Sequence, residues 1–264
     1  MNVEEQIAAI TLEMQGHSRI VVAFSGGVDS AVVAALAFRA LGENARAVTA
    51  VSATLAGREL EEAVIIAEEI GIPHETMRFS ELDNPQFTEN TSSRCFFCQS
   101  MRFDHLRVIA DRVGADVLAS GTNADDVGDD RPGLAAMEAR GIYQPLLKHN
   151  VSKAGVREFA QFLGLSVWDK PAAACLSSRI PHGQEVTYDR LKRIELAEEV
   201  LHGYGFRHYR VRDHEGLARI EVAVEELERI FDPSILPAIS REIRSAGFRR
   251  VAVDLCGYRA AGRQ

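Results

Sequence analysis

Three cysteines in two short segments have the side chains and the spacing that could support sulfur or metal chemistry. Cys95 and Cys98 form a C-x-x-C pair within RCFFC, and Cys175 stands alone within KPAAACLSSRIPHG. A C-x-x-C pair suits half of a zinc site, a redox dithiol or two buried thiols. A lone free cysteine is commonly a small buried apolar residue, so Cys175 by itself does not establish chemistry.

The surroundings of the cysteines narrow these possibilities. The sequence has no second Cys or His pair at the spacing of a zinc knuckle. RCFFC lies in what we expect to be a polar loop before a helix, whereas a thioredoxin-like pair opens a helix directly after a strand. Adding Cys175 would give three thiolate ligands for a 4Fe-4S cluster, with one iron left free. Cys256, in the apolar strand pattern VAVDLCGY, is expected to be structural.

A glycine-rich segment, SGGVDS at residues 25–30, is the second candidate for chemistry. It follows an apolar run typical of a buried parallel strand and precedes a helical pattern. Paired glycines let the backbone approach a ligand closely, and the N–H groups at a helix N-terminus attract anions. The sequence contains no Walker A pattern. We therefore expect SGGVDS to bind phosphate; the alternative is a plain strand–helix turn.

A polar loop at residues 120–126 follows a later strand pattern and contains Gly121, Asn123 and Asp125. The carboxyl ends of parallel strands meet at one edge of a sheet. Asn123 and Asp125 are therefore expected to line the same nucleotide site as SGGVDS. The alternative is a solvated acidic loop.

Alternating strand and helix patterns in the first 170 residues must position these groups. Short apolar runs predict strands at 19–25, 45–52, 74–79 and 116–120. Apolar residues at helical spacing predict helices at 29–41, 60–70, 103–113 and 153–163, the last with Ser152 as its N-cap. This alternation predicts an α/β fold with a doubly wound parallel sheet that binds ligands beyond the carboxyl ends of its strands.

The pattern changes near residue 187, where a smaller α+β domain is expected. A long helix at 187–202 leads into a strand pair at 206–212 and 217–224, and a last strand is expected at 248–255. We divide the chain into a nucleotide-binding domain, a junction loop that carries Cys175 and a C-terminal domain, with bounds 1–170, 171–186 and 187–264.

Composition and charge restrict the cellular setting and the partners. The 264 residues are 46% hydrophobic and 26% charged, as in ordinary globular proteins, and no apolar run is long enough to span a membrane. The N-terminus lacks the pattern of a secretory signal, and four cysteines are too few for a disulfide scaffold, so we expect a cytoplasmic protein. The net charge of -8 favours a small-molecule substrate over tRNA.

Four segments together resemble the LarE family, the ATP-dependent sulfur transferases of nickel-pincer nucleotide biosynthesis, over nearly the whole chain. They are SGGVDS, RCFFC, SGTNADDVGDDRPG and WDKPAAACLSSRIPHG. The first also resembles the PP-loop of ATP pyrophosphatases, which implies that its residues hold pyrophosphate and Mg²⁺. Those residues are Ser25, Gly26, Gly27, Asp29 and Ser30.

The resemblance implies a reaction. ATP adenylates the carboxylates of pyridinium-3,5-biscarboxylic acid mononucleotide, which then become thiocarboxylates with sulfur delivered through Cys175. In one form of the family the cysteine gives up its own sulfur and becomes dehydroalanine. In the other, a C-x-x-C and the central cysteine hold a 4Fe-4S cluster that carries a transferable sulfide, and the presence of Cys95 and Cys98 favours this form. Sulfide or another sulfur donor and a homo-oligomeric assembly are also implied.

Charged residues of the C-terminal part are candidates for substrate and ion binding. Arg210 and Arg212 alternate along a predicted strand and share a face, which suits a grip on the substrate's phosphate or a solvated surface. Arg179 could contact the same anion. The family resemblance suggests a divalent ion at Glu199 and Glu221.

Two other classes of function stay open at this point. A tRNA thiolase would share the phosphate loop, and some of these enzymes also carry a three-cysteine cluster. A non-catalytic nucleotide-binding or cofactor-carrier protein would not release pyrophosphate from ATP.

Overall fold

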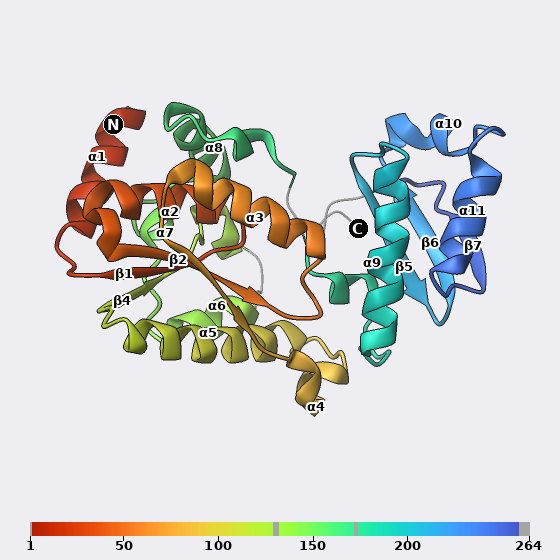
Figure 1. Ribbon diagram of the computed structural model, residues 1–264, viewed down its shortest axis with the longest axis horizontal. Helices are drawn as coiled ribbons and strands as arrows, with labels where there is room; N and C mark the ends of the chain where they lie inside the picture. The colour runs from red at the N-terminus through yellow and green to blue at the C-terminus, as the bar shows by residue number, and fades with distance from the viewer. Residues whose placement is uncertain (1, 129–131, 172–173, 259–264) are drawn as a thin grey trace. The chain divides into compact units, whose positions relative to one another are not determined.

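The computed structural model describes residues 2–128, 132–171 and 174–258, and the chain divides into two compact units (Figure 1). The first unit comprises 1–81 and 93–173, and the second comprises 82–92 and 174–264. The sequence suggested continuous parts with boundaries at 170 and 186. Segment 82–92 belongs with the second unit because its backbone bonds to the loop near residue 183: the Val186 N–H donates to the Thr88 carbonyl over 2.9 Å.

A parallel sheet forms the centre of the first unit, as the strand and helix patterns predicted. Its strands follow the order β3-β2-β1-β4 and are all parallel. Val22 of the central strand β1 pairs with Ala47 on β2 and with Ala119 on β4. The strands are β1 (Ile20–Ala23), β2 (Ala45–Val51), β3 (His74–Arg78) and β4 (Val117–Ala119).

Helices cover both faces of this sheet (Figure 1), which confirms the doubly wound α/β fold. Ile20 and Val22 face one apolar core, whereas Val21 faces the other, as alternation along a strand requires. The first core is built with α1 (Val3–Met14), α2 (Val28–Leu41), α3 (Gly57–Ile70) and α8 (Lys153–Phe162). The second is built with α5 (Arg94–Arg112) and α6 (Pro132–Glu138). Two single-turn helices, α4 (Pro85–Thr88) and α7 (Pro145–Lys148), were not predicted.

The buried face of α3 is formed by Ala63, Ile66 and Ala67, of which Ala63 packs against Gly26 of the SGGVDS turn. One local expectation was wrong. The C-x-x-C segment lies in α5 instead of a loop. Its helix was hidden in the sequence because the buried apolar stripe begins only at Phe103.

The second unit contains a three-stranded sheet in the order β5-β6-β7, with an antiparallel β5–β6 pair and a parallel β6–β7 pair. The long helix α9 (Tyr188–Gly203) begins at the predicted residue, where the Thr187 hydroxyl accepts the Arg190 N–H. It packs on β5 and α11. The other elements are β5 (Tyr209–His214), β6 (Leu217–Val222), α10 (Leu227–Ile230), α11 (Leu236–Ser245) and β7 (Arg250–Val253). Among the residues described in either unit, no helix combines the length and apolar character that a membrane span requires.

Candidate functional site

The SGGVDS segment forms the turn between β1 and α2, at the carboxyl end of β1. Gly26 has φ +69°, and a Cβ on this residue would lie 2.7 Å from the Cα of Ala63. Gly27 is the N-cap residue of α2, so the first N–H groups of the helix follow the turn directly. The Ser30 hydroxyl donates to the Gly27 carbonyl (3.0 Å) and accepts the Ser25 N–H (3.2 Å). Such a braced turn at a helix N-terminus can hold an anion.

Asp29, in the first turn of α2, is the meeting point of the predicted nucleotide-site residues. The Asn123 amide donates to Asp29 Oδ1 over 3.1 Å, and the Lys153 ammonium lies 2.5 Å from Asp29 Oδ2. The Lys153 backbone N–H donates to the Asp125 carboxylate over 2.9 Å. The structure therefore brings Asp29, Asn123 and Asp125 together beside the SGGVDS turn; residues 129–131 of the same motif lie outside the described residues.

Lys153 was not predicted for this site. It is the first residue of α8, whose N-cap Ser152 accepts the Gly155 N–H over 3.2 Å. Ser152 was predicted as this cap, so the sequence already located a basic residue at the start of a helix. What it lacked was a signal that this helix begins next to Asp29.

Gly121 contributes to the site through the absence of a side chain. A Cβ on Gly121 would lie 2.7 Å from both the carbonyl carbon of Asp29 and the nitrogen of Ser30. The loop after β4 therefore packs directly on the start of α2, which only glycine permits.

Lys170, which was also not predicted, ties the SGGVDS turn to α3. Its ammonium lies 2.9 Å from the Glu59 carboxylate and 2.6 Å from the Glu62 carboxylate, and 3.4 Å from the Gly26 carbonyl oxygen. The two carboxylates hold the cation beside the turn.

Cys95 and Cys98 lie at the start of α5, three residues apart and therefore on one face of the helix. Cys95 is exposed and Cys98 is buried. The Cys98 thiol donates to Glu81 Oε1 over 3.6 Å, and Arg102 Nη2 donates to the Cys98 sulfur over 3.7 Å. A thioredoxin-like dithiol opens a helix directly after a strand. Cys95 and Cys98 do open a helix, contrary to the expected loop, but no strand directly precedes α5.

Glu81 is a buried carboxylate that was not predicted. Its Oε1 accepts the hydroxyls of Ser52 (2.9 Å) and Thr54 (3.0 Å), whereas its Oε2 has no hydrogen-bond partner among the described residues. The Arg102 Nε is also buried without a hydrogen-bond partner there. The buried Cys98 sulfur therefore has a carboxylate and a guanidinium next to it.

Cys175 is the N-cap residue of a short 3₁₀ helix, η5 (Leu176–Arg179), in the second unit and is half-buried. Its sulfur lies 3.1 Å from the Ser177 hydroxyl. Arg179 was expected to contact substrate phosphate, but its guanidinium is buried and forms a bidentate ion pair with Glu198, at 2.9 and 3.0 Å. The same guanidinium donates to the carbonyls of Ala174 and Cys175.

Arg210 and Arg212 share one face of the second sheet, as predicted. The buried Arg210 guanidinium stacks over the Tyr258 ring, 4.8 Å from its centroid. Burial lowers the pKa of Arg210; Tyr258 opposes this, while the positive charges of Arg179 and Arg212 lower the pKa further. The three predicted arginines therefore lie close enough to act on one another.

The two glutamates predicted for a divalent ion have different surroundings. Glu221 is buried, and its carboxylate pairs with Arg212 and with Arg219, the latter at 3.0 Å. Glu199 is exposed on α9. Their ion site stays a prediction.

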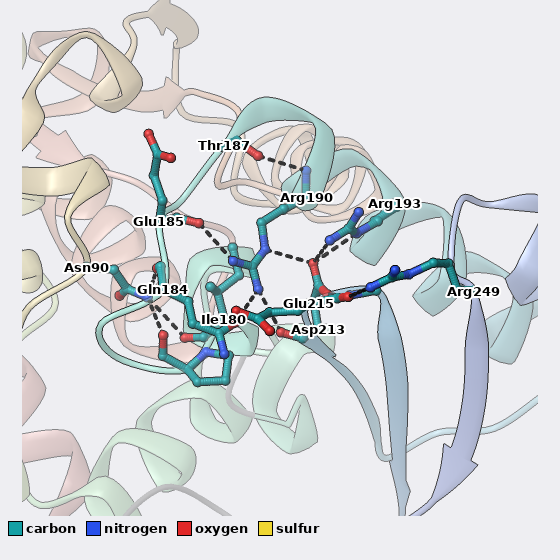
Figure 2. Close-up of polar contacts among 12 residues, drawn as sticks. Asn90, Ile180, Gln184, Glu185, Thr187, Arg190, Arg193, Asp213, Glu215 and Arg249 are labelled. Carbon is teal, nitrogen blue, oxygen red and sulfur yellow. Dashed lines mark hydrogen bonds and ion pairs between the residues drawn. The ribbon is translucent and has the colours of Figure 1, made fainter.

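A buried network fixes the far end of the Cys175 loop (Figure 2). Asn90 has φ +56° and is fully buried. Its amide nitrogen donates to three carbonyl oxygens, those of Ile180 (3.3 Å), Pro181 (2.8 Å) and Gln184 (2.8 Å). Segment 82–92 thereby holds the loop that follows Cys175.

Asp213 is the second centre in Figure 2 and is also fully buried. Its Oδ2 accepts the Nε groups of Arg190 and Arg193 from α9, each over 2.9 Å. Arg190 also donates to the side-chain oxygen of Gln184 over 2.6 Å. The network thus joins α9, β5 and the Cys175 loop.

The described residues partly fit the iron–sulfur cluster that the family resemblance implies. Thiolates are the soft ligands that iron–sulfur clusters use, and Cys95 and Cys98 share a helix face. Cys175 belongs to the other unit. Within each unit, the described residues include no group of three His, Cys, Asp or Glu side chains arranged to hold a metal ion.

One protein family and several individual proteins are similar in sequence to this chain. The NAD synthase family profile matches residues 2–100. An uncharacterized protein from Synechocystis sp. is 43% identical over 242 residues, which is 92% of this chain and 90% of that protein. The pyridinium-3,5-bisthiocarboxylic acid mononucleotide synthase of Lactiplantibacillus plantarum is 34% identical over 255 residues, which is 96% of this chain and 91% of the synthase.

A tRNA-specific 2-thiouridylase from Bartonella tribocorum is 40% identical over 134 residues, which is 42% of this chain and 33% of that enzyme. The match with the synthase, in contrast, extends through both units of the chain. Together with the parallel sheet and the PP-loop turn at its carboxyl edge, this match shows that the chain belongs to the LarE family of PP-loop sulfur transferases.

Proposed function

We propose that the protein is an ATP-dependent sulfur transferase that converts the carboxylates of pyridinium-3,5-biscarboxylic acid mononucleotide to thiocarboxylates. The observation that carries this proposal is the match with the Lactiplantibacillus synthase. Because it covers 96% of the chain, it spans both the SGGVDS turn and the Cys175 loop. The grouping of Asp29, Asn123 and Lys153 beside that turn supports the use of a nucleotide.

In the first half-reaction, a substrate carboxylate oxygen attacks the α-phosphorus of ATP and forms a new O–P bond. The bond between the α-phosphorus and the bridging oxygen breaks, so that pyrophosphate leaves and the substrate becomes an acyl adenylate. The N–H groups at the start of α2 and the hydroxyls of Ser25 and Ser30 bind the departing phosphates. Asp29 would hold the Mg²⁺ that accompanies the phosphates, and Lys153, whose ammonium lies 2.5 Å from Asp29 Oδ2, would compensate negative charge.

In the second half-reaction, sulfur attacks the acyl carbon and AMP leaves with the C–O bond electrons. A bound 4Fe-4S cluster, held by Cys95, Cys98 and Cys175, would supply a transferable sulfide. In the sacrificial alternative the Cys175 thiolate attacks, its Cβ–S bond then breaks with loss of the α-proton, and dehydroalanine remains. The presence of two cysteines on one face of α5 favours the cluster form.

The substrate's phosphate is assigned to the basic face of the second sheet. Arg210 and Arg212 lie on this face, and their guanidinium groups suit bidentate contact with a phosphate. A tRNA substrate is less compatible with the net charge of -8.

Two variants test the two half-reactions separately. Asp29→Ala is expected to abolish pyrophosphate release from ATP and the dicarboxylate mononucleotide, with an unchanged circular dichroism spectrum. Cys175→Ser is expected to keep pyrophosphate release and to lose thiocarboxylate formation. Thiocarboxylate formation by Cys175→Ser, or full pyrophosphate release by Asp29→Ala, would contradict these roles.

The source of the sulfur is tested by metal and mass analysis. Anaerobic purification or reconstitution is expected to give about four irons per chain, and Cys95→Ala to bind fewer. After many turnovers, an intact Cys175 mass supports the cluster form, whereas loss of the elements of hydrogen sulfide supports the sacrificial form.

A further inference from the structure

The Arg179 side chain uses every one of its nitrogens within the second unit. Nε and Nη2 donate to the two carboxylate oxygens of Glu198, over 2.9 and 3.0 Å. Nη1 donates to the Ala174 carbonyl (2.6 Å), the Cys175 carbonyl (3.1 Å) and the Ser178 hydroxyl (3.1 Å). The side chain is 8% exposed. These contacts use both oxygens of Glu198 and leave one N–H group, on Nη2, without an acceptor among the described residues. A buried guanidinium with a single N–H left cannot form the bidentate contact that suits a substrate phosphate.

Glu198 connects this guanidinium to the rest of the second unit. It projects from α9 and its side chain is 12% exposed. Its Oε1 also accepts the Val211 N–H from β5 over 3.0 Å. Burial is the largest single effect and would lower the pKa of Arg179, but the charge and the hydrogen bonds of Glu198, with smaller effects of Cys175 and Tyr258, together raise this pKa. The main chain at Cys175 is therefore held to a helix and a strand through one buried ion pair.

We infer that Arg179 is a positioning residue for Cys175, and that Glu198 holds it in place. Arg179 fixes the main-chain carbonyls of Ala174 and Cys175, so that the half-buried thiol keeps one orientation toward its reaction partner. It is not a ligand of the substrate's phosphate. The inference rests on the proposed function only in assigning sulfur delivery to Cys175.

Arg179→Lys and Glu198→Gln test the inference. Each keeps the approximate size of the side chain and removes part of the bidentate ion pair between Arg179 and Glu198. Hydrogen exchange of residues 174–180 is expected to accelerate roughly tenfold, since a buried bonding group loses its partner. Thiocarboxylate formation is expected to fall roughly tenfold to a hundredfold through loss of orientation. The KM for the mononucleotide in pyrophosphate release is expected to stay unchanged.

Arg193→Lys is the matched control. Arg193 also extends from α9 to a buried carboxylate, that of Asp213, but does not contact residues 174–175. In the Arg193→Lys variant, the hydrogen exchange of the amides at 174–180 and the rate of thiocarboxylate formation are expected to match those of the unsubstituted protein.

Two outcomes would overturn the inference. One is unchanged exchange at 174–180 in both Arg179→Lys and Glu198→Gln. The other is a raised KM for the mononucleotide in Arg179→Lys with normal sulfur transfer at saturation, which would make Arg179 a phosphate ligand. If the unsubstituted protein forms no thiocarboxylate, the proposed function fails, and the exchange comparison still decides whether Arg179 positions Cys175.

Discussion

The SGGVDS turn and the Cys175 loop are built in opposite ways. The turn consists of six consecutive residues, and neighbouring chain packs against it where Gly26 and Gly121 lack a side chain. The Cys175 loop is held by side chains that reach it from elsewhere, chiefly those of Asn90 and Glu198. A site that depends on missing side chains tolerates no addition, whereas a site that depends on long-range side chains tolerates no removal.

Gly26→Ala should have the largest effect, because it combines an unfavourable backbone with a steric overlap. A left-handed alanine costs roughly 1–2 kcal/mol. The added Cβ also meets Ala63 of α3 at 2.7–2.9 Å, and such overpacking costs roughly 1–3 kcal/mol more. We expect a large loss of unfolding free energy in urea and loss of pyrophosphate release.

Gly141→Ala provides the control for backbone strain alone. Gly141 has φ +60°, but a Cβ there would meet no atom within 4 Å. This variant should lose only roughly 1–2 kcal/mol and keep pyrophosphate release. Equal losses of stability for the two variants would show that close packing does not define the SGGVDS turn.

Asn90→Ala should have the next largest effect, since it removes a fully buried amide that donates to three carbonyl oxygens. Leaving buried polar groups unpaired costs roughly 1–3 kcal/mol. We expect lower unfolding free energy and faster hydrogen exchange at residues 180–186. Asn150→Ala is the control, because Asn150 also has positive φ (51°) but is exposed. If Asn150→Ala destabilised the protein as much, backbone strain rather than the carbonyl contacts would explain the loss.

Glu13→Gln should have the smallest effect on the free energy of unfolding. It tests whether the stabilisation from a contact between distant residues depends on the burial of that contact or on the sequence separation. Glu13 joins α1 to Tyr143, Lys148 and His149, but its side chain is 27% exposed. Burial would raise the pKa of Glu13, yet hydrogen bonds from these three residues lower it to about 2.

A carboxylate with a lowered pKa stabilises the folded state above its unfolded pKa of 4.5, and this contribution is lost as the pH falls through about 2. At pH 7 we expect Glu13→Gln to cost about 0–1 kcal/mol, the range for partly exposed ion pairs. The difference from the unsubstituted protein should vanish in thermal unfolding near pH 2. A pH-independent difference would show that the charge of Glu13 is not the cause.

The sequence was sufficient where the structure is local. Apolar runs located the four parallel strands, and Thr187 and Ser152 marked the starts of two helices correctly. SGGVDS could be recognised because its glycines, its strand and its helix are adjacent in the chain. The grouping of Asn123 with Asp29 also followed, because parallel strands end at one edge.

The sequence was not sufficient where distant side chains decide the structure. Arg179 looked available for an anion because nothing in the sequence links it to Glu198, nineteen positions away. Asn90 lies in a polar stretch without periodicity, so its burial had no signal. RCFFC looked like a loop because the first turns of α5 lack an apolar stripe. Each of these features depends on a contact or a helix face that only the folded chain defines.

Segment 82–92 also has a consequence for synthesis of the protein and for its dissection into fragments. The chain leaves the first unit after residue 81, returns at residue 93 and leaves again after residue 173. Neither unit is therefore a continuous stretch of sequence. During translation the Asn90 amide meets its acceptors only after residue 184 has been made, so the second unit completes its folding late. A fragment that begins at residue 174 would lack this amide and would expose carbonyls that the whole protein keeps paired.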